Sequence, residues 1–268
     1  GTHCATSAYA TVSWSVEPTP VSGTLTKNPN DNTVCEGELV SAVFTPGADG
    51  NGLDELEYRT RTGANWSVWV SYTSGNQIAT NGRSGVEIRT RRLASTCSPS
   101  AYVTVNWIVE AHAVAGSILK TPDNFNVCEG DLVSALLMPG TGGNGSDNLD
   151  FRTNNGSSWT AWSAYTQGTN ISTSGIHGVE MRTRRNATYC DNSTYSYASW
   201  LVEQTPVNGI LVKNPDAMGT CITGFVSAVL IPGDGGNGID ELQYRSSVGS
   251  SWSIWMPYTS GNNIAATG

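Results

Sequence analysis

Cysteine is the residue type in this sequence with the clearest capacity for covalent chemistry. The six cysteines fall into two registers that repeat every 93 residues, namely Cys4, Cys97 and Cys190, and Cys35, Cys128 and Cys221. No two of them have the C-x₂₋₄-C spacing of a zinc site, and no histidine accompanies them, so zinc is disfavoured. Cysteines in a Ser-, Thr- and Gly-rich chain with few lysines indicate disulfides formed in an oxidising, extracellular setting.

Two disulfide pairings are open. A spacing of 62 residues joins Cys35 to Cys97 and Cys128 to Cys190, whereas a spacing of 31 joins Cys4–Cys35, Cys97–Cys128 and Cys190–Cys221. Loop closure contributes roughly 3–4.5 kcal/mol in either case, so energy does not decide between them. The 62-residue pairing is preferred because a unit closed by its own disulfide can duplicate freely, although in a sandwich its two cysteines would lie at opposite ends.

Tryptophan is the second residue type with a chemical role to consider. In the run Trp66 to Trp69 the two indoles fall on opposite faces of a strand, and the same holds one and two repeats later. If the face of Trp66 is the core, then Trp69, Trp162 and Trp255 lie outside and could stack on sugar rings. The preferred interpretation is that they pack over outward-facing arginines by cation–π contact or against a neighbouring module.

Metal and catalytic sites receive little support. Asp49, Asn51 and Asp54 offer oxygen atoms in the manner of half a calcium loop, but only Asn-Gly-x-Asp recurs, and an Asn-Gly turn with positive φ explains it better. His3 and His112, like the remaining histidine, are out of register with the repeat, and no nucleophile elbow, H-E-x-x-H or P-loop occurs. We therefore expect no enzyme and no cofactor.

A repeat of 93 residues must position all of these side chains. Every Trp, Cys and Lys of the sequence obeys that period, as the set Trp14, Trp107 and Trp200 illustrates. Fixed-period self-similarity is typical of a module array. Pro- and Gly-containing linkers predict one complete module at 19–111 and another at 112–204, with 1–18 as the last strand of a preceding module and 205–268 as a partial one.

Within a module the pattern of apolar residues has period two. Val86 and Ile88 alternate with Glu87 and Arg89, which is typical of half-buried antiparallel strands. We predict no helix and seven strands in the first module, at 23–28, 38–45, 54–61, 66–72, 76–80, 85–92 and 101–110. Such a pattern predicts an all-β fold, a tandem array of immunoglobulin-like β-sandwiches. Charged residues on neighbouring outward positions predict cross-strand ion pairs.

Composition narrows the function classes. The formal net charge is −8, from 14 Lys and Arg against 22 Asp and Glu, which argues against nucleic acid as a partner. No stretch approaches the roughly 20 apolar residues of a membrane span, and no signal peptide is recognisable. The sequence begins and ends out of phase with its own repeat, so we expect it to be part of a longer array.

The repeat resembles a known kind of protein. Its signature runs Val-Cys-Glu-Gly (34–37), Tyr-Arg-Thr to Trp-Ser-x-Trp (58–69), Gly-Val-Glu-Ile-Arg-Thr-Arg-Arg (85–92) and Trp-x-Val-Glu (107–110). This is similar to the tandem immunoglobulin-like repeats of very large surface and secreted proteins of Bacteroidetes, including gliding-motility adhesins exported by the type 9 secretion system. The resemblance implies a stalk or fibre segment of a bacterial cell-surface adhesin or filament.

The physical properties of such an array agree with that role. Strands of up to ten residues give modules about 35–40 Å long, and short linkers restrict the motion of adjacent units. The expected partners are neighbouring repeats, surface polysaccharide or other filament chains. The alternative function is an array of carbohydrate-binding modules attached to a secreted hydrolase.

Overall fold

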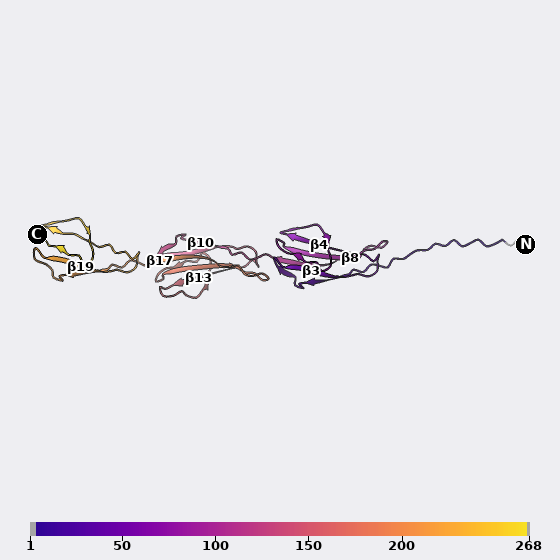
Figure 1. Ribbon diagram of the computed structural model, residues 1–268, viewed down its shortest axis with the longest axis horizontal. Coiled ribbons are helices and arrows are strands. Elements are labelled where there is room, and N and C mark those ends of the chain that lie inside the picture. Colours follow the sequence, from indigo (N-terminus) through magenta and orange to yellow (C-terminus); the bar gives the residue numbers. More distant parts are fainter. Residues whose placement is uncertain (1–3, 267–268) are drawn as a thin grey trace. The chain divides into compact units, whose positions relative to one another are not determined.

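All regular secondary structure in the described part of the chain is β-strand. The computed structural model describes residues 4–266, and no helix occurs within that range (Figure 1). Two compact units are present: one contains the residues up to 116 together with 139–148 and 184–194, and the other contains 117–138, 149–183 and the residues from 195 onward. The prediction of an all-β chain without helices is confirmed.

The first repeat consists of two sheets. One is the antiparallel sheet β1 (Thr24–Asn28), β3 (Leu39–Thr45) and β7 (Ile78–Ala79), in that order. The other has the order β2 (Thr33–Cys35), β9 (Val103–Glu110), β8 (Gly85–Arg92), β4 (Asp54–Thr62) and β5 (Asn65–Trp66), with β6 (Val70–Ser71) also paired to β4. This is the immunoglobulin-like arrangement. The second and fifth strands of the sandwich, β3 and β7, lie in one sheet, and the third, sixth and seventh strands, β4, β8 and β9, lie in the other.

Strand β2 is the element that the sequence pattern did not predict. It pairs in parallel with β9, with Val34 opposite Val109, and contributes a buried valine to the core. Three residues are too few to show an alternation of apolar and polar side chains. The predicted strand 66–72 is also interrupted, because only its two ends pair with β4, as β5 and β6.

The second repeat reproduces this topology. Its smaller sheet has the order β10 (Ser117–Thr121), β12 (Leu132–Met138) and β15 (Ile171–Ser172). Its larger sheet has the order β11 (Asn126–Cys128), β17 (Ser196–Glu203), β16 (Gly178–Arg185), β13 (Asp147–Asn154) and β14 (Ser163–Ala164). The parallel pairing of β11 with β17 repeats that of β2 with β9.

Each of these repeats has its own hydrophobic core around one tryptophan. Trp107 and Trp200 are each 1% exposed, and each indole Nε1–H donates a hydrogen bond of 2.9 Å, to the carbonyls of Pro29 and Pro122 respectively. The side chains packed around Trp107 in the first core include Val34, Val40, Ala42, Tyr72, Val86, Ile88 and Val109. The indole is therefore buried without leaving its polar group unpaired, as burial requires.

The chain beyond residue 204 and before residue 21 is less enclosed. Strands β18 (Ile210–Asn214), β19 (Phe225–Ile231) and β24 (Ile264–Ala265) form the smaller sheet of a third repeat, and two short hairpins accompany them, β20 (Gln243–Tyr244) with β23 (Met256–Pro257) and β21 (Ser247–Val248) with β22 (Ser251–Trp252). Residues 4–20 contain no strand. Trp14 matches Trp107 in the repeat but is 82% exposed, because no other strand of the described residues pairs with its segment.

Candidate functional site: a disulfide joint and an arginine–tryptophan ladder

The disulfide of this chain joins two repeats. Cys35, the last residue of β2, is bonded to Cys190, which lies in the loop between β16 and β17 of the second repeat, at a sequence separation of 155. This pairing corrects both spacings expected from the sequence, 62 and 31, including the preferred pair Cys35–Cys97. The reason is that residues 184–194 pack with the first compact unit, which brings the loop of one repeat against the end of β2 in the repeat before it.

The other cysteines are unpaired thiols at the surface. Cys4, Cys97, Cys128 and Cys221 are free and exposed. Cys97 and Cys128 occupy the same positions in their repeats as Cys190 and Cys35 do in theirs.

A histidine does accompany the bridged cysteines, contrary to the interpretation of the sequence. His112 Nδ1 lies 3.8 Å from Cys35 Sγ, and the potential ligand atoms of His112, Cys35 and Cys190 all lie within 4.8 Å of one another. Because the two sulfurs are bonded to each other, they are not available as thiolate ligands. The histidine has no counterpart in the other linkers, so the repeat offered no signal for it; His3 lies outside the described residues.

Glu110 holds the loop that carries Cys190. The carboxylate of this last residue of β9 accepts hydrogen bonds from the backbone N–H groups of Thr188, Tyr189 and Cys190, the last at 2.8 Å. Partial burial acts to raise the pKa of Glu110, but the N–H donors of Cys190, Tyr189 and Thr188 outweigh it and lower that pKa below its ordinary value.

The same arrangement occurs one repeat earlier, where there is no disulfide. The Glu17 carboxylate accepts hydrogen bonds from the N–H groups of Ser95, Thr96 and Cys97, at 2.8, 2.5 and 2.9 Å. The donors of Ser95, Cys97 and Thr96 lower the pKa of Glu17. The loop of Cys97 is therefore held on the preceding segment just as the loop of Cys190 is.

The β2 side of the joint is also fixed by backbone contacts. The N–H of Cys35 donates to the Glu38 carboxylate at 2.9 Å, and the N–H of Glu36 donates to the Glu110 carbonyl at 2.9 Å. Thr80 is fully buried beneath this turn, and its hydroxyl donates to the Glu38 carbonyl at 2.8 Å while accepting from the Gly37 N–H at 2.9 Å. The turn that presents Cys35 is thus held in one position.

The linkers are hydrogen-bonded to neighbouring loops. Val114 exchanges two backbone hydrogen bonds with Thr141, at 2.9 and 3.0 Å, and isolated bridges join Val21 to Ala48 and Val207 to Asp234 in the same way. A glycine directly precedes each of the loop residues that bond to a linker, namely Ala48, Thr141 and Asp234. A Cβ at Gly140, for example, would lie 2.2 Å from the Val114 carbonyl oxygen. The linker can approach this closely only where a side chain is missing.

Arginine side chains and aromatic rings alternate on the outer face of β4 and β8. The Arg59 guanidinium lies 4.5 Å from the ring centroid of Trp66 and 4.4 Å from that of Trp69. Arg89 lies 3.9 Å from Trp69 and 3.9 Å from Tyr102. We call the stack formed by Trp66, Arg59, Trp69, Arg89 and Tyr102 the arginine–tryptophan ladder. The expectation that Trp66 and Trp69 fall on opposite faces is wrong, because both indoles contact Arg59 on the outer face. Strict alternation does not apply between them, since the chain is not a continuous strand from β5 to β6.

Cross-strand ion pairs hold this ladder in register. Arg59 pairs with Glu87 at 2.6 Å and Arg89 pairs with Glu57 at 2.7 Å, each with the residue opposite it across β4 and β8. The prediction of cross-strand ion pairs is confirmed. Each guanidinium pairs with a carboxylate and lies over an indole ring, so ion pairs and cation–π contacts together connect the side chains on this outer face of the sheet.

The ladder recurs in the second repeat and is partial in the third. Trp162 lies between Arg152, at 4.5 Å from its centroid, and Arg182, at 4.2 Å. Trp255 contacts Arg245 at 4.8 Å and is 56% exposed. Guanidinium groups thus cover Trp69 and Trp162 at the positions where a sugar ring would stack.

The candidate calcium residues form a turn. Asn51 accepts a hydrogen bond from the Leu53 N–H at 3.0 Å, and Gly52 has a φ of +86°. Asp54 pairs with Arg92 at 2.7 Å. Asp49 lies in the same turn with a φ of +59°. The turn geometry agrees with the interpretation of Asn-Gly as a turn, and the ion pair of Asp54 with Arg92 is an addition that the sequence did not indicate.

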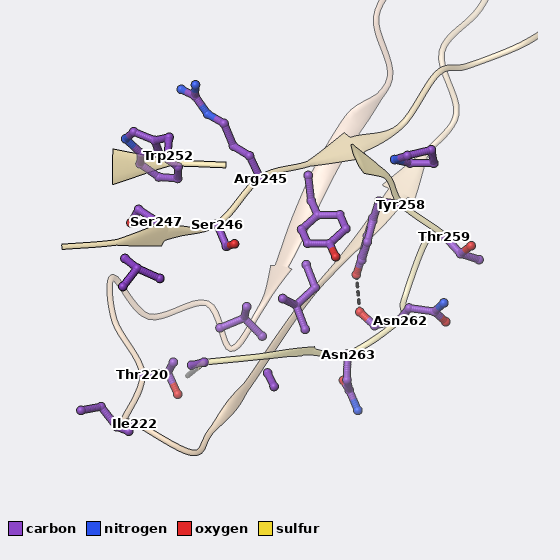
Figure 2. A pocket seen from close by; sticks show the side chains of 17 residues that line it. Thr220, Ile222, Arg245, Ser246, Ser247, Trp252, Tyr258, Thr259, Asn262 and Asn263 are labelled. Carbon is purple, nitrogen blue, oxygen red and sulfur yellow. Dashed lines mark hydrogen bonds between the residues drawn. The ribbon is translucent and has the colours of Figure 1, made fainter. Parts of the chain in front are cut away.

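A cavity of about 760 Å³ opens on the third repeat (Figure 2). Its lining includes Val226 and Tyr258, whose counterparts Val133 and Tyr165 are buried in the second core. Tyr258 donates a hydrogen bond to the Asn262 carbonyl, as Tyr165 does to Thr169. The cavity is the inner face of a sandwich and lacks only the strands that cover the equivalent face elsewhere.

The described residues include no helix that could cross a bilayer.

No protein-family model matches the sequence, and no curated protein matches it. Among solved structures, it is similar to the N-terminal eight Ig domains of Down Syndrome Cell Adhesion Molecule, with 10% identity, a TM-score of 0.32, and coverage of 82% of this chain and 34% of that one. Murine CEACAM1b gives 12% identity, a TM-score of 0.29, and coverage of 68% and 100%.

A third similar structure contains the N-terminal four Ig domains of Dscam1, with 9% identity, a TM-score of 0.23, and coverage of 82% of this chain and 60% of that one. The chain thus spans about a third of the first of these structures. The strand order described above defines the class of protein: a tandem array of immunoglobulin-like β-sandwiches.

Proposed function

We propose that this chain is a structural segment of a stalk or fibre in a large extracellular adhesin or surface filament. The observation that carries the proposal is the disulfide between Cys35 and Cys190, which joins consecutive repeats covalently. A protein that only needed to display independent binding modules would not require such a link. A protein that must withstand tension along its chain benefits from it directly.

The benefit follows from the path that a pulling force takes. Force applied to the two ends of the chain passes from Cys35 to Cys190 through the disulfide and bypasses the residues between them. Those residues include β3 to β16, most of two repeats. The link therefore keeps most of this length from being stretched even after the sandwiches open.

The arginine–tryptophan ladder supports the structural function over carbohydrate binding. Two ion-paired guanidinium groups lie over the Trp69 ring, at 4.4 and 3.9 Å from its centroid, so a sugar that stacked there would have to compete with them. We assign the ladder to stiffening the outer face of each sheet.

The finer parts of the proposal concern location and organisation. A disulfide is stable in an oxidising compartment, which supports an extracellular location. The resemblance of the repeat to Bacteroidetes surface proteins supports the bacterial cell surface. We also propose that 19–111 and 112–204 are the two repeating modules, because each of these ranges contains one complete core.

Single-molecule stretching of the full chain, held at its two ends, tests the proposal. With the disulfide intact, we expect the fully stretched chain to be roughly 500–560 Å shorter than that of Cys35→Ser, since 155 residues at about 3.3–3.6 Å each are withheld. In Cys35→Ser, two unfolding steps of similar size should appear, one for each complete unit.

Cys97→Ser is the matched control, because it removes an exposed cysteine of the same repeat that is unpaired in this chain. It should stretch to the same length as the unmodified chain. Equal stretched lengths for the unmodified chain and Cys35→Ser would show that the bridge carries no load and would refute the stalk function.

A further inference from the structure

The bridge between Cys35 and Cys190 obeys a rule that also accounts for the four unpaired cysteines. It joins a cysteine at the end of β2 to a cysteine 155 residues later, in the next repeat. Cys128 and Cys221 occupy the register of Cys35, so their partners would lie 155 residues later, beyond residue 268. Cys4 and Cys97 occupy the register of Cys190, so their partners would lie 155 residues earlier, before residue 1. The rule thus leaves unpaired the same four cysteines that the structure leaves unpaired.

We infer that Cys97 and Cys128 each form one half of a separate inter-repeat disulfide joint. The partner of Cys97 is a cysteine of the repeat before it, and the partner of Cys128 is a cysteine of the repeat after it, 155 residues later in the array. In a longer array, every repeat would then be bonded once to the repeat before it and once to the repeat after it. The inference goes beyond the proposed function, because it would hold for any array of these repeats whatever the array carries.

The half-joint at Cys97 has the geometry of the completed one. Its N–H donates to the Glu17 carboxylate at 2.9 Å, and its thiol Sγ lies 3.5 Å from the Glu17 carbonyl. In the bridged joint, Cys190 makes the equivalent contacts with Glu110 at 2.8 and 3.3 Å. The loop is therefore in its joined position although the partner sulfur is not in this chain.

The half-joint at Cys128 reproduces the other side. Its N–H donates to the Asp131 carboxylate at 2.9 Å, as that of Cys35 does to Glu38. The N–H of the next residue, Glu129, donates to the Glu203 carbonyl at 2.9 Å, which repeats the contact between Glu36 and Glu110. Glu203 also occupies the position of Glu110, the residue whose carboxylate holds the incoming loop.

Formation of each joint is a two-electron oxidation. Two thiols lose two protons and two electrons as the sulfur–sulfur bond forms, and a disulfide oxidant such as oxidised glutathione accepts them and is released as two thiols. Cys97 and Cys128, the cysteines of the two half-joints, are exposed, so such an oxidant can reach them.

Adding one cysteine in register provides the test. The full chain is extended after residue 268 with a second copy of its own residues 176–204, which continue the 93-residue register and complete the third repeat. Both chains are refolded in a glutathione redox buffer, and free thiols are counted. The unmodified chain has six cysteines and one bridge and should show four thiols.

In the extended chain, the inference predicts three free thiols instead of four, because the added cysteine forms a disulfide with Cys128. Peptide mapping without reduction should find Cys128 bonded to the added cysteine and Cys35 still bonded to Cys190. Cys128→Ser in the extended chain should restore the count to four. Five thiols, or a bridge from the added cysteine to Cys221 or to another chain, would overturn the inference.

A second extension tests the inference independently, in case the added residues do not fold with the third repeat. A copy of residues 19–93 placed before Gly1 completes a preceding repeat and offers a partner to Cys97 instead. Three free thiols with a bridge to Cys97 are expected, and five would again overturn the inference. Failure here would leave the stretching result untouched, because that experiment depends only on Cys35 and Cys190.

Discussion

The carboxylate of Glu110 accepts a hydrogen bond of 2.8 Å from the backbone N–H of Cys190, a residue 80 positions further along the chain. One charged side chain at the end of β9 thus fixes the loop that carries one cysteine of the bridge. The ionisation of Glu110 should therefore control how firmly the joint is held.

Acid should weaken the joint. The pKa of Glu110 is lowered in the folded chain, so its contribution to stability is fully present above the unfolded value of about 4.3 and is lost as the pH falls through the lower folded value. We expect Glu110→Gln to cost about 1 kcal/mol at pH 7, and the cost should shrink progressively as the pH falls below about 4.3. Denaturant unfolding of both chains across that range measures the difference. A constant difference at all pH values would refute this function of the carboxylate.

Two tryptophans of the same register should respond in opposite ways to truncation. Trp107→Ala empties the centre of the first core and leaves the Pro29 carbonyl without its donor, so a loss of about 3–5 kcal/mol is expected. Trp14→Ala should change stability by less than about 0.5 kcal/mol, because that indole is 82% exposed. Thermal unfolding followed by circular dichroism compares them. Similar losses would contradict the burial described above.

The ladder should depend on the planar shape of its arginines as well as on their charge. Arg89→Ala removes contacts with Trp69 and Tyr102 and the ion pair with Glu57, and we expect a loss of about 1–2 kcal/mol. Arg89→Lys should recover only part of it. Arg83→Ala is the control, since that arginine is exposed and outside the ladder. Near-ultraviolet circular dichroism should report the changed surroundings of Trp69 in the Arg89 variants alone.

Loss of the bridge should destabilise the first compact unit. The chain-entropy relation gives up to about 5 kcal/mol for a loop closed across 155 residues, so Cys35→Ser should unfold at a markedly lower denaturant concentration. Cys128→Ser, which removes an unpaired cysteine, should leave the midpoint within error. The same shift on adding a reductant to the unmodified chain would show that the bridge, and not the mutation, is responsible. A reductant without effect would argue against a stabilising bridge.

Much of the fold follows from patterns that repeat. Alternation along 85–92 predicted both the strand and its outward charges, because side chains on a strand alternate between the core and solvent. The outward charges of the third and sixth predicted strands also indicated cross-strand ion pairs, and the structure supplies their register, with Arg59 opposite Glu87. The positive φ of Gly52 was expected from the Asn-Gly dipeptide for a purely local reason.

The disulfide could not be predicted in the same way. Spacing within one sequence register gives every cysteine several equivalent partners, and only the packing of residues 184–194 against the preceding repeat distinguishes Cys190 from Cys97 as the partner of Cys35. His112 was missed because it occurs in one linker and not in the others. Contacts between repeats depend on how one unit meets the next, which no pattern within a unit encodes.

The bridge has a consequence for a chain exposed to proteases. A single backbone cut anywhere between Cys35 and Cys190 leaves the two fragments covalently attached, because the sulfur–sulfur bond spans the cut. The linker at 111–116 lies inside that span, so a cut in the linker would not separate the two repeats. If every joint is closed in this way, the spans of successive bridges overlap, and an array with a single cut in any span would remain covalently continuous.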